Sequence, residues 1–303
     1  MKIFIFGKNP EYKDSDIVIL PVGFEKTTTY KKGTSKGPEA ILEASKNLEL
    51  YDEELKLTPK LSIFTDEIKI KDNQEDMVNE IENKSVKYLK DNKFVLMLGG
   101  EHTISLGLVK ALKNKYKDFT VLQLDAHSDL RNEYDFERLH HATVMRRVHE
   151  LKIPIVQVGI RSLSEEEALF IKKEKINTFY ANDFNIKKII SSIKTNNVYI
   201  TIDLDVLDPS IMPSVGTPEP NGLNWNQITS LLKEISKSKN IISADIVELS
   251  PIENLEHPNF TAAKLAYKLL GYKFYKNNIT ETFGTLKRKM SGQNFKNMVR
   301  KGW

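Results

Sequence analysis

Short apolar segments recur along the chain and alternate with longer stretches in which apolar residues follow a helical spacing. The apolar segments are residues 17–22, 94–100, 119–125, 153–160, 198–205 and 241–249. They are continuously apolar rather than alternating, which is typical of strands that are buried on both faces of a parallel sheet. The pattern therefore predicts a parallel sheet with helices covering both of its faces.

Helix start signals lie between several of these segments. Pro38 opens one predicted helix, residues 74–90 form an amphipathic stretch, Ser164 and Glu167 have the spacing of a capping box, and Pro258 stands near the start of another helix. The alternation of strands and helices predicts a three-layer αβα sandwich with a mainly parallel, doubly wound sheet. Ligands of such folds bind at the carboxyl ends of the strands.

Composition and charge limit the classes of partner. The chain has 303 residues, with 45 basic and 41 acidic side chains, so its body lacks the single-sign field of nucleic-acid or membrane binders. No stretch approaches the ~20 apolar residues of a membrane span, and no signal-peptide cleavage pattern follows the N-terminus. We expect a cytoplasmic protein with one α/β domain over residues 1–275.

The last 28 residues differ from this body. Residues 276–303 contain seven basic residues and one acidic residue. We predict a basic C-terminal tail that is solvated or contacts another subunit, because it carries no recognisable binding motif. We assign the tail no function.

Candidate metal ligands gather where three predicted strands end. The chain has no cysteine, so any metal must be held by nitrogen and oxygen ligands. The candidates are His102 after the segment 94–100, Asp125, His127 and Asp129 after 119–124, and Asp203 and Asp205 at the end of 198–205. Side chains two apart on an extended strand share a face, so each group can point into one cleft.

Four carboxylates this close cannot all stay ionised without cations, because like charges raise one another's pKa values. Six ligands suit two metals with bridging aspartates, and a His/Asp set without thiolates favours Mn²⁺. A single aspartate at a strand end is more often a turn or capping residue, and Asp208, which precedes a proline, is interpreted as structural. His149 and His257 are also given structural roles.

The motifs GGEHT (99–103), DAHSD (125–129) and DLDVLDPS (203–210) resemble, in this order, the metal motifs of the ureohydrolase family of arginases and agmatinases. Further segments similar to the family are VGIRS at 158–162, GTPEPNGL at 216–223 and DIVELSP at 245–251. The resemblance implies an arginase-like α/β fold, two Mn²⁺ ions per subunit, and hydrolysis of a guanidinium group to urea and an amine. It also implies a homo-oligomer, either a trimer or a hexamer.

The resemblance implies a role for each candidate residue. One metal would be held by His102, Asp125, Asp129 and Asp203, and the other by His127, Asp125, Asp203 and Asp205. Asp125 and Asp203 would bridge the metals. Glu248 would fix the guanidinium, Asp129 would hydrogen-bond the attacking hydroxide, and His141 would shuttle a proton to the leaving amine. His140 receives no role, and Arg131 is expected to form a structural salt bridge.

Agmatine is the predicted substrate, with urea and putrescine as products, which would place the enzyme in polyamine biosynthesis. The loop at 130–141 lacks the serine with which arginases bind arginine, and the segment 129–148 resembles the prokaryotic agmatinase branch. Glu133, Asp135 and Glu137 in this loop offer negative charge for the second amine of agmatine.

Other activities stay open at this point. Arginase, guanidinobutyrase or a similar guanidino-compound hydrolase is the nearest alternative. More distant is a zinc deacetylase-like hydrolase, suggested by the tandem His140 and His141, although that family needs one metal and its Asp-X-His-His pattern is absent. A non-catalytic metal-binding relative is the third alternative.

Overall fold

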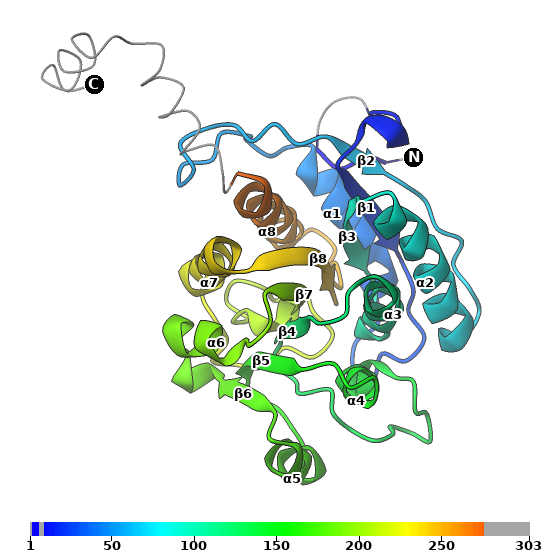
Figure 1. Ribbon diagram of the computed structural model, residues 1–303, viewed down its shortest axis with the longest axis vertical. Coiled ribbons are helices and arrows are strands. Elements are labelled where there is room, and N and C mark those ends of the chain that lie inside the picture. Colours follow the sequence, from blue (N-terminus) through cyan, green and yellow to red (C-terminus); the bar gives the residue numbers. More distant parts are fainter. Residues whose placement is uncertain (1, 6–8, 276–303) are drawn as a thin grey trace, which may run out of the picture.

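All strands of the described chain run parallel in one sheet, in the order β2-β1-β3-β8-β7-β4-β5-β6 (Figure 1). The computed structural model describes residues 2–5 and 9–275. The strands are β1 (Ile17–Val22), β2 (Ile63–Thr65), β3 (Phe94–Gly99), β4 (Thr120–Leu124), β5 (Ile155–Ile160), β6 (Asn177–Tyr180), β7 (Asn197–Asp203) and β8 (Asn240–Val247). The predicted basic tail, residues 276–303, lies outside the described residues.

Each apolar segment that was predicted to be a strand contains a strand in the structure. The observed bounds differ from the predicted bounds by a few residues at most. The sequence pattern did not indicate β2 and β6, which form the two edges of the sheet. They have only three and four residues, and β6 is not buried, so neither produces an apolar run. The predicted three-layer parallel α/β fold is confirmed.

Eight α-helices cover the sheet in the described part of the chain. They are α1 (Gly37–Ser45), α2 (Gln74–Lys90), α3 (Ser105–Lys115), α4 (Val144–Glu150), α5 (Glu165–Glu174), α6 (Ile186–Ser192), α7 (Trp225–Ser238) and α8 (His257–Phe274). Pro38 and Pro258 stand in the first turns of α1 and α8. The predicted capping box of α5 is also present: Ser164 accepts from the Glu167 backbone N–H, and Glu167 accepts from that of Ser164.

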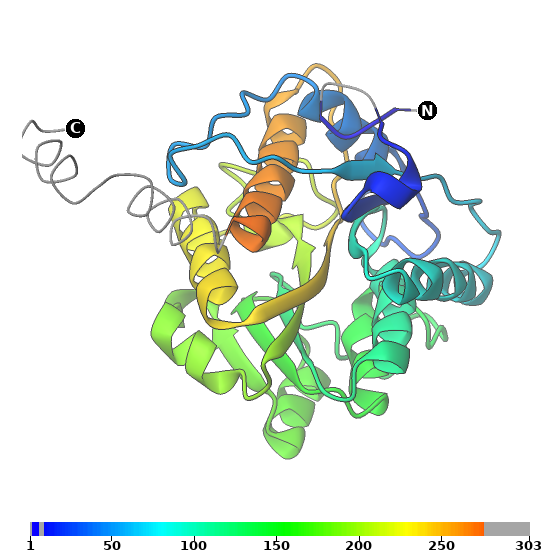
Figure 2. The same ribbon diagram turned by 45° about the horizontal axis from the view of Figure 1, so that its top comes forward.

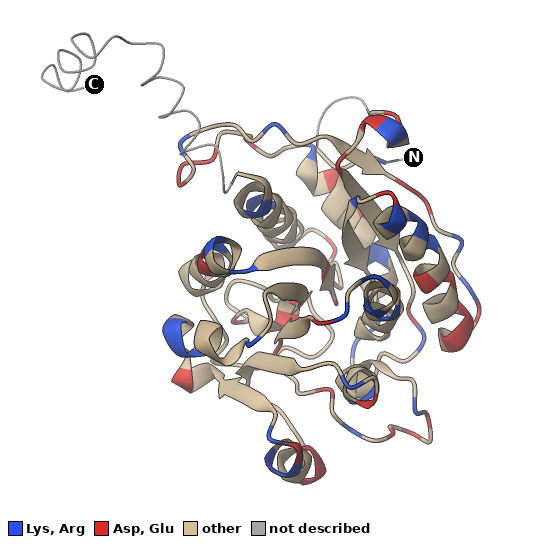
Figure 3. Ribbon diagram, viewed as in Figure 1, with Lys and Arg blue, Asp and Glu red and all other residues tan. Residues whose placement is uncertain are grey.

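Successive strand residues enter two separate cores, one on each face of the sheet. Figure 2 shows the helices that flank the sheet. In β1, Ile17 and Ile19 join the core that is covered by α1, α6, α7 and α8, whereas Val18 and Leu20 join the core under α2, α3 and α4. Charged residues of both signs lie mostly on the helices and loops, and the strands are largely uncharged (Figure 3). This arrangement explains the continuous apolar runs of the sequence.

The order of the strands decides where chemistry can occur. Strands β3 and β4 follow one another in the chain but are not neighbours in the sheet. The later strands β8 and β7 lie between them. The neighbouring carboxyl ends of β3, β8, β7 and β4 therefore meet at the centre of the sheet, the usual place for ligands in such folds. None of the helices in residues 2–5 and 9–275 has the length and apolarity that crossing a membrane requires.

A buried lysine attaches the loop after α1 to the outer helices. Lys268 of α8 is fully buried, and its Nζ lies 3.1 Å from Asp52 Oδ2, 2.8 Å from Glu53 Oε1 and 3.1 Å from Glu54 Oε1. Asp52 is buried as well, and Glu54 also pairs with Lys233 of α7 at 2.9 Å. The cation thus compensates the buried charge of Asp52.

We expect Lys268→Ala to lower the free energy of unfolding by about 3–5 kcal/mol, because Asp52 would be left as an uncompensated buried charge. Chemical denaturation followed by circular dichroism measures this loss. Lys237→Ala is the matched control, since its exposed pair with Glu234 within α7 contributes about 0–1 kcal/mol. Equal stability of the two variants would contradict the assigned role of Lys268.

Candidate metal centre and active site

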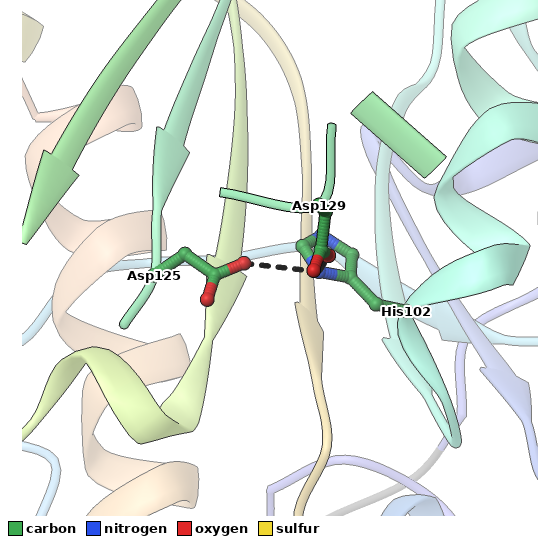
Figure 4. A group of neighbouring side chains, drawn as sticks. All are labelled: His102, Asp125 and Asp129. Carbon is green, nitrogen blue, oxygen red and sulfur yellow. Dashed lines mark ion pairs between the residues drawn. The ribbon is translucent and has the colours of Figure 1, made fainter. Parts of the chain in front are cut away.

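The predicted site residues come together at the carboxyl ends of the four central strands. His102 lies in a 3-10 turn after β3, Asp125 directly follows β4, Asp203 is the last residue of β7, and Glu248 directly follows β8. Figure 4 shows the side chains of His102, Asp125 and Asp129 pointing toward one another. All five side chains are buried.

Two overlapping groups of potential ligand atoms share Asp125. The ligand atoms of His102, Asp125 and Asp129 lie within 4.8 Å of one another, and so do those of Asp125, His127 and Asp205. Nδ1 of His102 is 3.2 Å from Asp125 Oδ2 and 3.0 Å from Asp129 Oδ2. Asp203 Oδ2 lies 3.6 Å from the same nitrogen. The geometry thus provides two neighbouring donor sets, with a shared carboxylate between them.

Hydrogen bonds behind His102 determine which of its ring nitrogens faces the carboxylates. Thr201 donates its only hydroxyl hydrogen to Asp245 Oδ1 at 2.6 Å and lies 2.8 Å from His102 Nε2. Thr201 must therefore accept a hydrogen bond from Nε2–H. In the neutral ring this leaves a lone pair on Nδ1, which has no hydrogen-bond partner among the described residues.

Burial opposes protonation of His102, but Asp125 and Asp129 raise its pKa well above its usual value. The position between its Nδ1 and the three carboxylates therefore calls for a cation, either a proton or a metal ion. The donor set therefore fits a divalent metal held by nitrogen and oxygen ligands. The neighbouring pKa values show the same excess of negative charge. Burial and the carboxylates of Asp129 and Asp205 raise the pKa of Asp125 to about 7. Burial opposes protonation of His127, but Asp205 and Asp125 raise its pKa to about 10.

Two of the carboxylates reach the cluster by turns, not by the strand alternation that the sequence suggested. Asp205 belongs to a 3-10 turn, in which its backbone N–H donates to Asp203 Oδ1 at 2.9 Å. This turn places Asp205 Oδ2 2.8 Å from His127 Nδ1. Asp129 has a φ of 53°, a left-handed conformation that is uncommon for a residue with a side chain. The sequence thus predicted correctly that these carboxylates lie together, but it attributed the position of Asp129 and Asp205 to an extended strand, which is wrong.

Glu248 and His141 lie together beside this cluster. Glu248 has a φ of 67°, and its N–H donates to the Gly100 carbonyl at 2.8 Å. Its Oε1 accepts the N–H of His102 at 2.7 Å and is 3.4 Å from His141 Nδ1. The opposite nitrogen of His141, Nε2, is buried without a hydrogen-bond partner in the described structure.

The charge state of His141 depends on the same neighbours. Burial alone lowers the pKa of His141, but Glu248, Asp129 and Glu101 together raise it above its usual value. His141 can therefore hold a proton near neutral pH, with one nitrogen toward Glu248 and the other free. This is the arrangement that a general acid needs.

Sequence reasoning missed the residues that support His141 from behind. The Thr27 hydroxyl accepts the backbone N–H of His141 at 3.0 Å and donates to Glu101 Oε1 at 2.8 Å. Glu101 is fully buried, and its Oε2 accepts the N–H of Thr27 at 2.7 Å. The available signal was a carboxylate next to His102, but its partner Thr27 lies 74 residues earlier.

Two buried amides, also missed, support Asp125. Gln123 Nε2 donates to Asp125 Oδ2 at 2.7 Å, and Gln157 Nε2 donates to Gln123 Oε1 at 2.7 Å. Both glutamines are fully buried. Their signal was available, since a polar residue inside a continuously apolar strand requires a partner.

A cavity opens above the cluster. Its wall consists of Thr29, His127, Asp129, Arg131, Tyr134, His141, Ala142, Ser162, Leu163, Glu167, Asp203, Asp205, Gly216, Thr217 and Glu248. Arg131 forms the expected salt bridge, with Nε 3.8 Å from Glu167 Oε2, and lies 5.4 Å from the centre of the Tyr134 ring. The carboxylates proposed for the amine tail, those of Glu133, Asp135 and Glu137, are exposed and do not belong to this wall.

The remaining candidates lie where the sequence interpretation put them. Asp208 accepts hydrogen bonds from Ser210 and from the Gly222 N–H, as a turn residue does. His149 packs on Phe170 and lies 3.5 Å from Glu174, away from the cavity. His257 is the first residue of α8.

The model of the family described as "Arginase family" matches residues 15–271, which include every site residue described above. The chain belongs to the arginase family. It is accordingly a hydrolase of the ureohydrolase type, which acts on C–N bonds in linear amidines, as its sequence predicted.

Individual relatives of this arginase-family enzyme carry two kinds of name. It is 41% identical to the N(1)-aminopropylagmatine ureohydrolase of Synechocystis over 86% of its own length and 90% of that protein. It is 33% identical to the agmatinase of Pyrococcus horikoshii over 86% of its own length and 93% of that protein. Among solved structures, the agmatine ureohydrolase of Thermoplasma volcanium superposes on this chain with a TM-score of 0.81 and is 30% identical to it. The match covers 89% of this chain and 96% of that protein.

Proposed function

We propose that this enzyme hydrolyses the guanidinium group of an agmatine-type compound, and that its preferred substrate is N(1)-aminopropylagmatine. The observation that carries the chemistry is the pair of donor sets sharing Asp125, with Glu248 and His141 at their side. This preference departs from the sequence-based prediction of agmatine, and its support is the 41% identical relative, which is named an N(1)-aminopropylagmatine ureohydrolase. Agmatine itself is the second candidate, favoured by the agmatinase relatives.

In this proposal His102, Asp125, Asp129 and Asp203 hold one Mn²⁺ ion, and His127, Asp125, Asp203 and Asp205 hold the other. When bound, two such ions lower the pKa of water enough to supply hydroxide near neutral pH. Asp129 orients the attacking oxygen by accepting a hydrogen bond from it.

Glu248 would bind the planar guanidinium. A carboxylate can accept paired N–H donors and so fix the orientation of this cation. Glu248 is suited to this role because its carboxylate is buried at the cavity wall, and its Oε1 is held by the His102 N–H. The substrate carbon is thereby placed beside the metal donors, so that attack becomes effectively intramolecular.

His141 would complete the reaction by protonating the amine that leaves. Its Nε2 is free, and its pKa is raised, so the proton is present near neutral pH. Proton donation to the amine nitrogen prevents the return of the amine to the carbon. The products would be urea and the free amine, which is a triamine from the aminopropyl compound and putrescine from agmatine.

Urea release by the purified, Mn²⁺-reconstituted protein tests the proposal. The panel contains N(1)-aminopropylagmatine, agmatine, arginine and guanidinobutyrate, and bound metal is measured alongside. We expect two metals per subunit and a kcat/KM for the aminopropyl compound about tenfold or more above that for agmatine, about 1.4 kcal/mol.

Each result has a distinct meaning. A preference for agmatine would overturn the substrate and keep the chemistry. A preference for arginine would also overturn the agmatine class. Absence of urea from every compound, with two metals bound, would favour the non-catalytic alternative. The same preparation, passed over a sizing column with light scattering, tests the proposed trimer or hexamer.

A further inference from the structure

His140 lies directly before the proposed acid and was given no role by the sequence interpretation. In the structure it is buried, with 4% of its surface exposed. It is the N-cap of the 3-10 turn His141–Thr143, with extended φ and ψ of −147° and 155°. Its Nδ1 accepts the backbone N–H of Ala142 at 3.1 Å, and its own N–H donates to Thr143 Oγ1 at 3.0 Å. These reciprocal bonds form a capping box around His141.

The ring of His140 also contacts two other rings. It stacks on Tyr134 with centroids 4.6 Å apart and planes 22° apart, and the His141 ring lies 4.7 Å away on a tilt of 48°. Tyr134 and His141 both line the cavity. The side chain of His140 thus links the wall of the cavity to the residue that would deliver the proton.

Only one form of His140 is compatible with these contacts. Nδ1 must carry a lone pair to accept from Ala142, so the ring hydrogen lies on Nε2. Burial and then the charges of His141 and Arg131, which face it, lower the pKa of His140 to about 3. The ring therefore stays neutral while its neighbour His141 is protonated.

We propose that His140 is a positioning residue that holds His141 in its reactive orientation through the Nδ1 cap on Ala142. The inference rests on the proposed function, since it takes His141 as the proton donor. Two supports then act on the backbone of one short turn, Thr27 at the His141 N–H and His140 at the Ala142 N–H. Loss of either lets the imidazole move, and misplacement by about 1 Å can lower turnover by about 100-fold.

Two variants separate the cap from the stacked ring. His140→Asn keeps an acceptor suited to an N-cap but removes the imidazole, whereas His140→Phe keeps a ring for Tyr134 but has no acceptor. We expect His140→Phe to lower kcat about tenfold or more with KM and metal content nearly unchanged. His140→Asn should stay within about threefold of the wild type. His149→Asn, at a histidine outside the cavity, is the matched control.

Amide hydrogen exchange, followed by NMR, provides a readout that does not depend on activity. The Ala142 amide should exchange about tenfold faster in His140→Phe and remain protected in His140→Asn. The ¹⁵N shifts of His140 should show the Nε2–H tautomer, without titration between pH 5 and 8.

Wild-type kcat in His140→Phe, or equal loss in both variants, would overturn the proposal, as would a His140 that titrates near pH 6.5. If the wild type releases no urea, the proposed function fails. The exchange rate of the Ala142 amide then tests the hydrogen bond to His140 independently of activity. Protection of this amide in His140→Phe equal to that of the wild type would show that His140 does not hold the turn.

Discussion

Asp125→Asn should leave the enzyme with at most one bound metal and lower kcat/KM at least about 1000-fold, about 4 kcal/mol. The reason is that Asp125 is the carboxylate shared by both donor sets. An amide keeps the size of the side chain but removes the charge that two neighbouring cations require. Metal content by mass spectrometry and urea release together measure the effect.

Asp208→Asn is the matched control for this substitution. Asp208 lies three residues beyond Asp205, yet its carboxylate belongs to neither donor set and accepts hydrogen bonds from Ser210 and from the Gly222 N–H. It should retain both metals and nearly all activity. Full metal content and activity in Asp125→Asn would show that Asp125 does not bridge two metals.

His141→Asn should retain both metals and lower kcat by about 100- to 10,000-fold, the usual contribution of a positioned general acid. His141 belongs to neither donor set, so its loss removes the proton and leaves the nucleophile. Wild-type turnover should fall as pH rises through the raised pKa of His141, because only the protonated ring can donate. This alkaline decline should be missing in the variant.

The comparison for His141→Asn is again His149→Asn, which removes an imidazole that lies away from the cavity. Loss of metal from His141→Asn would mean that the residue supports the metal centre. A kcat equal to that of the wild type would mean that another group supplies the proton.

The sheet was readable from sequence because both of its faces are buried. Each central strand gives a mainly apolar run, and the polar residues after it mark where it ends. The two edge strands, β2 and β6, were not predicted because they are short. The order of the strands could not be predicted either, since no local pattern indicates that β7 and β8 lie between β3 and β4.

The convergence of the candidate residues was predictable from sequence, but their local geometry was not. Strand alternation suggested that Asp203 and Asp205 share a face, whereas a 3-10 turn brings Asp205 to His127. Left-handed conformations at Asp129 and Glu248 are set by tertiary contacts, such as the bond from Glu248 N–H to Gly100. The support of His141 by Thr27 joins positions 114 residues apart, which no motif reveals.

The central side chains of the candidate site and the outer wall of the cavity have different structural supports. Asp125, Asp203 and Glu248 stand at the ends of central strands, whereas Arg131, Tyr134 and Thr217 belong to loops. Loops accept substitutions and insertions more readily than the strands they connect. We therefore expect that replacing residues 131–139 with the corresponding loop of a relative that prefers another substrate changes the ratio of kcat/KM between substrates more than it changes kcat.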